Sequence, residues 1–330
     1  MRISRSIFLF CAVALLSAKS QSSEATNHTY TPVNTYSIIA YDSATGQFGA
    51  AVQSHWFRVA DVIWVQPGVG AVATQSLVDF AYGPLGIEMM RLGKTSRQAL
   101  AGLLASDSLN AIRQVAMIDK NGLVSTHTGN KCIAEAGHRS GKFYSCQANL
   151  MRNHTVWDAM AIAFENTTGD LSERMMAALE AAQKEGGDIR GMQSAAMVVV
   201  TGKPTGQSWR DKIVDIRVDD ADQPLVELRR LLDVTHAYDH MNRGDELIAI
   251  GKMDSAAVEY GAAMTLAPDN LEIQFWHAVT LVTSNELERS LPIFERIFKA
   301  DDSWRILIPR LVESELLPND QSVIAKILAQ

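Results

Sequence analysis

Several residues in this sequence could do chemistry, and a glycine-rich string is the first to test. Residues 67–73 read Pro-Gly-Val-Gly-Ala-Val-Ala, which contains the Gly-x-Gly-x-x-Ala pattern of dinucleotide-binding turns. That pattern needs a helix N-terminus directly after the glycines to hold a pyrophosphate. Here a strand-like run, Thr74-Gln-Ser76, follows instead. A tight hairpin turn therefore fits the string better than a cofactor site.

Histidine is the next residue type that could serve a site. The eight histidines are scattered, and the sequence has no His-Glu-x-x-His, paired Cys-x-x-Cys or phosphate-loop pattern. We therefore expect no sequence-local metal site and no cofactor. His127 ends an expected strand and His138 lies in an expected loop, and each fits a site residue or an ordinary hydrogen-bonded histidine. Nucleic-acid binding needs a basic face, and the net charge of −7 argues against one. We therefore expect no nucleic-acid partner.

The first twenty residues are typical of a secretory signal peptide. Arg2 and Arg5 precede a short apolar run over residues 7–18, which ends in small residues. The run is too short to span a bilayer comfortably, so we expect export to the periplasm or medium and no stable membrane span after its removal. An uncleaved membrane anchor is the alternative. Removal of residues 1–20 takes away three basic residues and no acidic one, and lowers the net charge to −10. Residues 21–34 form a polar leader.

Export affects the two cysteines that remain, Cys132 and Cys146. They flank a glycine-containing loop at residues 137–141, and a bridge closing about 15 residues would contribute roughly 3 kcal/mol in the chain-entropy model. We predict that their Cα atoms lie within the ~7 Å that a disulfide requires. Two buried thiols are the alternative.

The composition and patterning of residues 35–233 predict an α+β domain with antiparallel pairing. At 47% hydrophobic and 20% charged, the chain resembles ordinary globular proteins rather than disordered or multi-span membrane proteins. Short apolar runs alternate with turn signals, such as Asn121-Gly122, and two helical stretches interrupt them. Strands are expected at 35–41, 48–53, 62–66, 70–74, 114–119, 123–127, 195–200 and 213–218, and helices at 86–92, 95–105, 156–165 and 171–184.

Residues 234–330 read as an all-α domain with an internal repeat. Small and aromatic residues recur with the 34-residue period of tetratricopeptide repeats, so that Ala278 and Phe294 match Gly244 and Tyr260. Small residues let paired helices approach, and the aromatic ring fills the space between repeats. We expect no strand over 237–317, burial of both rings, and a peptide or protein partner held by these helices.

The N-terminal domain also resembles a known family. Six segments carry the resemblance to the family catalogued as domain of unknown function 1028, which belongs to the N-terminal-nucleophile hydrolase superfamily. They lie at residues 35–42, 70–76, 82–86, 127–129, 186–195 and 217–220. The resemblance implies a four-layer αββα sandwich. Members often carry a helical C-terminal extension, and some are described as peptidoglycan-binding or fimbrial-assembly proteins, which implies a cell-wall fragment as a further partner.

The superfamily resemblance also implies a nucleophile. A Thr, Ser or Cys at the mature N-terminus opens the first strand, and its α-amine, with a pKa near 8, acts as the base. Thr35 occupies this place, but only a second cut at Asn34–Thr35 would free its amine. No lysine occurs between Lys19 and Lys94 to assist it, so Ser54, His55 or Asp61 must help. Thr35 could equally be an ordinary β-branched strand residue.

Other side chains could line the same cleft. Gln75 and Ser76 leave a strand where relatives place an oxyanion-stabilising amide. Gln147 and Asn149 could orient a substrate amide, His127 could contact the substrate, and Arg190 and Gln193 lie in a glycine-rich turn.

Two functions follow from this sequence. The first is an exported amide-bond hydrolase that uses Thr35 on a peptide, an acylated amine or a wall fragment. The second is a non-catalytic exported binding or scaffold protein, associated with the cell wall or with fimbrial assembly, that uses its helical tail.

Overall fold

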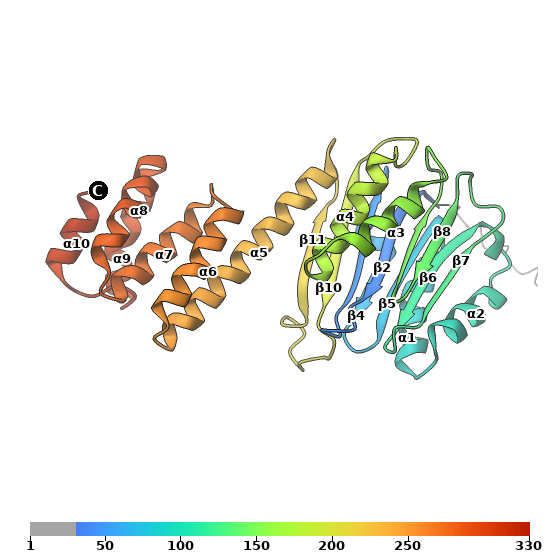
Figure 1. Ribbon diagram of the computed structural model, residues 1–330, viewed down its shortest axis with the longest axis horizontal. Helices are drawn as coiled ribbons and strands as arrows, with labels where there is room; N and C mark the ends of the chain where they lie inside the picture. Colours follow the sequence, from blue (N-terminus) through green and yellow to red (C-terminus); the bar gives the residue numbers. More distant parts are fainter. Residues whose placement is uncertain (1–30) are drawn as a thin grey trace, which may run out of the picture. The chain divides into compact units, whose positions relative to one another are not determined.

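A computed structural model describes residues 31–330 and contains two antiparallel β-sheets (Figure 1). The predicted signal peptide, and the leader up to residue 30, lie outside the described residues. The first sheet has the order β1-β5-β6-β7, with β4 also paired to β5, and the second has the order β11-β10-β3-β2-β9-β8. The strands are β1 (Thr31–Val33), β2 (Thr35–Tyr41), β3 (Phe48–Ser54), β4 (Ile63–Gln66), β5 (Gly70–Val78), β6 (Arg113–Asp119), β7 (Val124–Thr128), β8 (Gly137–Gly141), β9 (Tyr144–Ala148), β10 (Ser194–Val200) and β11 (Lys212–Val218).

Helices cover the outer face of each sheet. Helices α1 (Tyr82–Arg91) and α2 (Ser96–Ser106) pack on β5, β6 and β7, whereas α3 (Val156–Asn166) and α4 (Leu171–Lys184) pack on β2, β3, β8 and β9. Thr95 is the N-cap of α2 and forms a capping box with Gln98. The prediction of a mixed α/β region with antiparallel pairing, followed by a helical region, is therefore confirmed.

The alternation of side chains along β2 separates two interiors. Tyr36, Ile38 and Ala40 face the core beneath α3 and α4, while Ile39 faces the core between the two sheets. Thr35 and Ser37 lie on the same face of the strand as Ile39, but they replace its apolar contacts with polar ones. The space between the sheets is therefore apolar over most of its length and polar at the end where β2 begins.

The C-terminal region consists of helices α5 (Pro224–Ala249), α6 (Met253–Leu266), α7 (Leu271–Thr283), α8 (Leu287–Ala300), α9 (Leu307–Glu313) and α10 (Gln321–Leu328). No strand occurs between residues 237 and 317, and the Tyr260 and Phe294 side chains are 1% and 0% exposed, as expected. A Cβ added to Gly244 would lie 2.9 Å from the Tyr260 ring, so the small residue is what lets α5 and α6 approach. The predicted boundary between residues 233 and 234 falls inside α5. None of the helices described is long and apolar enough to cross a membrane.

The predicted pairing of Cys132 with Cys146 is wrong, because both thiols are free. Cys146 faces the core beneath α3 and α4, since it lies opposite Ile38 on β9. Cys132 instead donates its thiol hydrogen to the Arg113 carbonyl of the other sheet, at 3.3 Å. The two residues therefore belong to different layers.

Candidate functional site

Thr35 begins β2, directly after a strand formed by the leader. Residues 31–33 form β1, which pairs antiparallel with residues 76–78 at the end of β5. We call residues 31–34 the leader strand. With the leader strand in place the Thr35 side chain is fully buried, and its hydroxyl donates to the Val33 carbonyl oxygen at 2.9 Å. The Thr35 nitrogen is a peptide amide in this form, so it cannot act as a base.

Two donors converge on the carbonyl oxygen of the peptide bond that precedes Thr35. The Ser54 hydroxyl donates to the Asn34 oxygen at 2.6 Å, and Arg190 Nη2 donates to the same oxygen at 2.8 Å. Ser54 reaches it because it lies directly opposite Thr35 in the β2–β3 pairing. Such a pair of donors lowers the energy of negative charge developing on a carbonyl oxygen.

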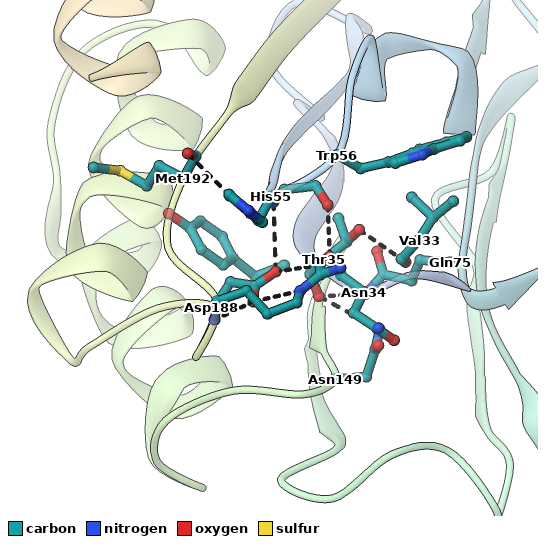
Figure 2. Close-up of polar contacts among 12 residues, drawn as sticks. Val33, Asn34, Thr35, His55, Trp56, Gln75, Asn149, Asp188 and Met192 are labelled. Atoms are coloured by element: carbon teal, nitrogen blue, oxygen red, sulfur yellow. Dashed lines mark hydrogen bonds and ion pairs between the residues drawn. The ribbon is translucent and has the colours of Figure 1, made fainter. Parts of the chain in front are cut away.

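Arg190 is held in place by the loop between α4 and β10. Gly187 and Gly191 adopt φ angles of 55° and 109°, which only glycine adopts freely, and they allow the chain to turn sharply around Asp188. The buried Asp188 carboxylate accepts from Arg190 Nε at 3.0 Å and from Arg190 Nη2 at 2.6 Å. This two-point ion pair fixes the guanidinium plane and leaves Nη2 free to reach Asn34 as well. Figure 2 shows Asp188 beside Asn34.

The carbonyl oxygen of Thr35 is also held, by one residue of β5 and by the residue that follows β9. It accepts from Gln75 Nε2 and from the Asn149 backbone nitrogen, each at 3.1 Å (Figure 2). Gln114 Oε1 in turn accepts from Gln75 and Asn149, at 2.7 and 2.9 Å. Further hydrogen bonds link Gln75 to Ser37 and Ser37 to Gln147. We call the five residues Ser37, Gln75, Gln114, Gln147 and Asn149 the amide cluster.

Unpartnered polar atoms concentrate around this cluster. Ten buried side-chain nitrogen and oxygen atoms among the described residues have no hydrogen-bond partner, and four of them belong to Asn34, Ser76, Gln147 and Asn149. Ser76, which pairs with Val33, also has a φ angle of 73° that is unusual for a residue other than glycine. Buried polar groups are normally satisfied, and strained backbone persists where function requires it. Their concentration beside Thr35 therefore makes this region the candidate functional site.

His55 follows Ser54 but is directed elsewhere. Its side chain is exposed, and Nδ1 lies 3.2 Å from the Met192 carbonyl oxygen. Figure 2 shows the ring pointing toward Met192. Its backbone nitrogen donates to Asp188 Oδ2 at 3.5 Å. His55 thus lies beside the site without contacting Thr35 through its imidazole.

His127 is farther from these groups, because Nε2 lies 2.8 Å from the Asn110 carbonyl oxygen on the opposite face of β7. The next residue, Thr128, accepts from Gln114 Nε2 at 2.9 Å and lines a hollow of about 570 Å³ with Cys132, Glu135, His138 and Trp157. Burial lowers the pKa of His138, and the nearby His127 adds to this effect. Burial raises the pKa of the Cys132 thiol. Both groups are therefore neutral near pH 7.

Sequence reasoning placed Thr35, Ser54, Gln75, Ser76 and Asn149 together, and the structure gathers them at one end of the inter-sheet space. Sequence reasoning missed Ser37, Gln114 and Asp188. Gln114 had one usable signal, since it is an amide directly before the apolar run Val115–Ile118. Over residues 31–330, no three His, Cys, Asp or Glu side chains gather as metal ligands would.

The fold and site define a mixed α/β protein with two antiparallel sheets and a buried polar centre between them. Residues 35–228 match the model of a family of unknown function, DUF1028, and the chain belongs to that family. It is similar to the crystal structure of protein SPO2555 from Silicibacter pomeroyi, described with the same family model, at 28% identity and a TM-score of 0.54. The match covers 60% of this chain and 88% of that one. No curated protein matches the sequence.

Proposed function

We propose that this protein is an exported amide-bond hydrolase in which Thr35 is the nucleophile, and that the chain first cleaves its own Asn34–Thr35 bond. The fold assigned with it is the four-layer αββα sandwich of N-terminal-nucleophile hydrolases, followed by tetratricopeptide-like helices. One observation carries the proposal, namely the convergence of Ser54 Oγ and Arg190 Nη2 on the Asn34 carbonyl oxygen. Two donors on one amide carbonyl stabilise the oxyanion of a tetrahedral intermediate.

Self-cleavage follows from the covalent geometry of residues 34 and 35. Three atoms, Cβ, Cα and N, separate Thr35 Oγ1 from the Asn34 carbonyl carbon, so attack closes a five-membered ring. A C–O bond forms, the C–N bond breaks, and the hydroxyl proton ends on the Thr35 nitrogen. Water then hydrolyses the ester, which releases Asn34 as a carboxylic acid and restores the Thr35 hydroxyl. The remaining chain begins with Thr35 and has a free α-amine.

The freed amine is the base of the mature site. With a pKa near 8 it takes the Thr35 hydroxyl proton as Oγ1 attacks a substrate amide, and it returns that proton to the leaving amine. Water then hydrolyses the acyl-enzyme ester. Ser54 and Arg190 act on the substrate oxyanion as they act on Asn34. Arg190 supplies the cation for which related enzymes use a lysine, and His55, which faces Met192, is not needed as a base.

The intact mass of the purified full-length chain tests the proposal. We expect a species that begins at Thr35 for the wild type and for Thr35→Ser, and a retained leader for Thr35→Ala. Ser54→Ala should slow the cut roughly 100- to 1000-fold, the usual effect of losing one oxyanion donor. Thr45→Ala, in an exposed turn, is the matched control and should cleave normally. A wild-type chain that keeps residues 31–34 would overturn the proposal.

A second function, the non-catalytic exported binding or scaffold protein of the cell wall or of fimbrial assembly, is favoured by the complete burial of Thr35 beneath the leader strand. In this case the Asn34–Thr35 bond stays intact, and the helical region holds a peptide or protein partner. A mature chain starting near residue 21, with no product that begins at Thr35, would support this function over hydrolysis.

A further inference from the structure

The leader strand itself indicates the class of substrate, an inference that rests on the proposed function. We infer that residues 31–34 lie where the acyl side of the substrate binds. The substrate is then an extended peptide that adds as a strand to the end of β5. It carries a short side chain at the residue whose carbonyl is attacked, and a small β-branched apolar side chain one residue earlier.

The first step of the argument is that one nucleophile serves both reactions. Thr35 Oγ1 attacks Asn34 in self-cleavage and the substrate later, and the same two donors, Ser54 and Arg190, must meet either oxyanion. A substrate carbonyl therefore has to occupy the place of the Asn34 carbonyl. The residues that precede it in the substrate must follow the path that β1 takes.

The path of β1 is set by main-chain pairing. Val33, Pro32 and Thr31 lie opposite Ser76, Leu77 and Val78 in antiparallel register. Strand addition of this kind binds the backbone of any extended peptide, and selectivity then comes from the pockets that receive its side chains. An extended backbone is hence the first requirement on the substrate.

The residue at position 33 enters a closed apolar pocket. Val33 is fully buried in the core between the sheets, where Val59, Val62 and Val78 are also buried and Trp56 packs against them. Figure 2 shows the Trp56 ring beside Val33. Because such interiors are close-packed, a phenyl group in place of the isopropyl group would overfill this space.

The positions on either side of Val33, residues 34 and 32, differ from it in what they accept. Asn34 is nearly fully buried, and its Oδ1 atom has no hydrogen-bond partner among the described residues, so this pocket limits the size of the side chain without donating to it. A bulky aromatic ring at this position would overfill the space, as it would at position 33. Pro32 is exposed, so the position before the apolar one carries no side-chain selectivity.

Processed full-length protein, with its start at Thr35 verified by mass, allows a direct test with 4-nitroanilides of acetylated tetrapeptides. Acetyl-Thr-Pro-Val-Asn is the reference, and the replacements are Phe for Val, Phe for Asn and, as the matched control, Ala for Pro. We expect kcat/KM to fall roughly 10- to 100-fold for the first two replacements and to change little for the control. The hexapeptide of residues 29–34 should compete with the reference, and its Phe-for-Val form should not.

A parallel test in the full chain compares the self-cleavage rates of Val33→Phe, Val33→Thr and Pro32→Ala. Val33→Thr keeps the shape of valine and is the control for changing this position without overfilling the pocket. Slow cleavage should therefore be confined to Val33→Phe. Cleavage of all peptides at equal rates by a correctly processed protein would overturn this inference and leave the hydrolase standing. An unprocessed wild-type chain would remove both, and the mass measurement separates the two results.

Discussion

The amide cluster and the aromatic interior of the helical region are both buried, yet they are built in opposite ways. Around the amide cluster, side-chain amides and hydroxyls hold one another and the Thr35 carbonyl, and four polar atoms remain unpaired. In the helical region, Phe275 packs edge-on against Phe294 and tilts against Trp304, at centroid distances of 5.9 and 5.0 Å. The comparison teaches that the second interior stabilises the fold, whereas the first costs stability, which is what the proposed function would require of a site.

The largest expected effect on stability lies in the aromatic interior. Phe294→Ala should lower the free energy of unfolding by about 3–5 kcal/mol, because a fully buried ring is replaced by a cavity. Urea unfolding of the full chain measures it, with Val258→Ala, at 72% exposure, as the control that should change little. Self-cleavage at Thr35 should be unaffected. A small loss of stability would show that the helical region is held by something other than this packing.

A histidine in the helical region provides the next test. His277 is 7% exposed, stacks on Tyr260 at 4.5 Å and has no hydrogen-bond partner among the described residues. Burial, helped by Arg289, lowers its pKa to about 4, below the unfolded value near 6.5. The neutral His277 therefore makes its full contribution to the free energy of unfolding above pH 6.5. This contribution, roughly 3 kcal/mol, is lost as pH falls through 4.

His277→Leu isolates this contribution, since leucine does not titrate. Unfolding followed by circular dichroism from pH 4 to 8 should show the wild type losing stability on acidification and the variant losing distinctly less. Parallel curves for the two proteins would contradict the assignment.

A smaller effect with the opposite sign is expected at Gln53, which precedes Ser54 in β3 and lies on the opposite face of the sheet, across from Tyr36. Both polar atoms of the Gln53 side chain are buried without partners, so Gln53→Met should raise the free energy of unfolding by about 1–2 kcal/mol. Gln114→Met is the matched control. Gln114 bonds Gln75, Asn149 and Thr128, and its loss should destabilise the protein by about 1–3 kcal/mol. If Gln53→Met were destabilising instead, the idea that this buried, unpaired amide costs stability would fail.

Much of the fold could be predicted because its signals are local. The alternation over residues 35–41, the turn at Asp42–Gln47 and the capping box at Thr95 act over a few residues, and the 34-residue period correctly indicated the burial of Tyr260 and Phe294. Strands β8 and β9 were missed. Residues 137–141, Gly-His-Arg-Ser-Gly, lie at the sheet edge and contain no apolar side chain to reveal a strand.

The site was less predictable because its contacts are distant in sequence. Arg190 meets Asn34 across 156 positions, and nothing in a glycine-rich turn indicates that its arginine points there. The error on the cysteines has a similar origin. Which face of β9 Cys146 occupies depends on the β2–β9 register, and this register is set by the whole sheet rather than by the loop between the two thiols.

Departure of the leader strand, which the proposed function requires, would have a consequence for how the processed protein behaves in concentrated solution. The amide and carbonyl groups of residues 76–78 would lose their partners and become an open sheet edge, the kind of surface through which proteins aggregate. The open edge would be short, because β4 pairs with Gly70–Ala73 on the same side of β5. The positive φ angle of Ser76 also interrupts regular strand geometry at the start of the gap. A three-residue peptide segment would fit there, but a long strand from a second copy would not, so we expect the processed chain to be protected from continued edge-to-edge assembly.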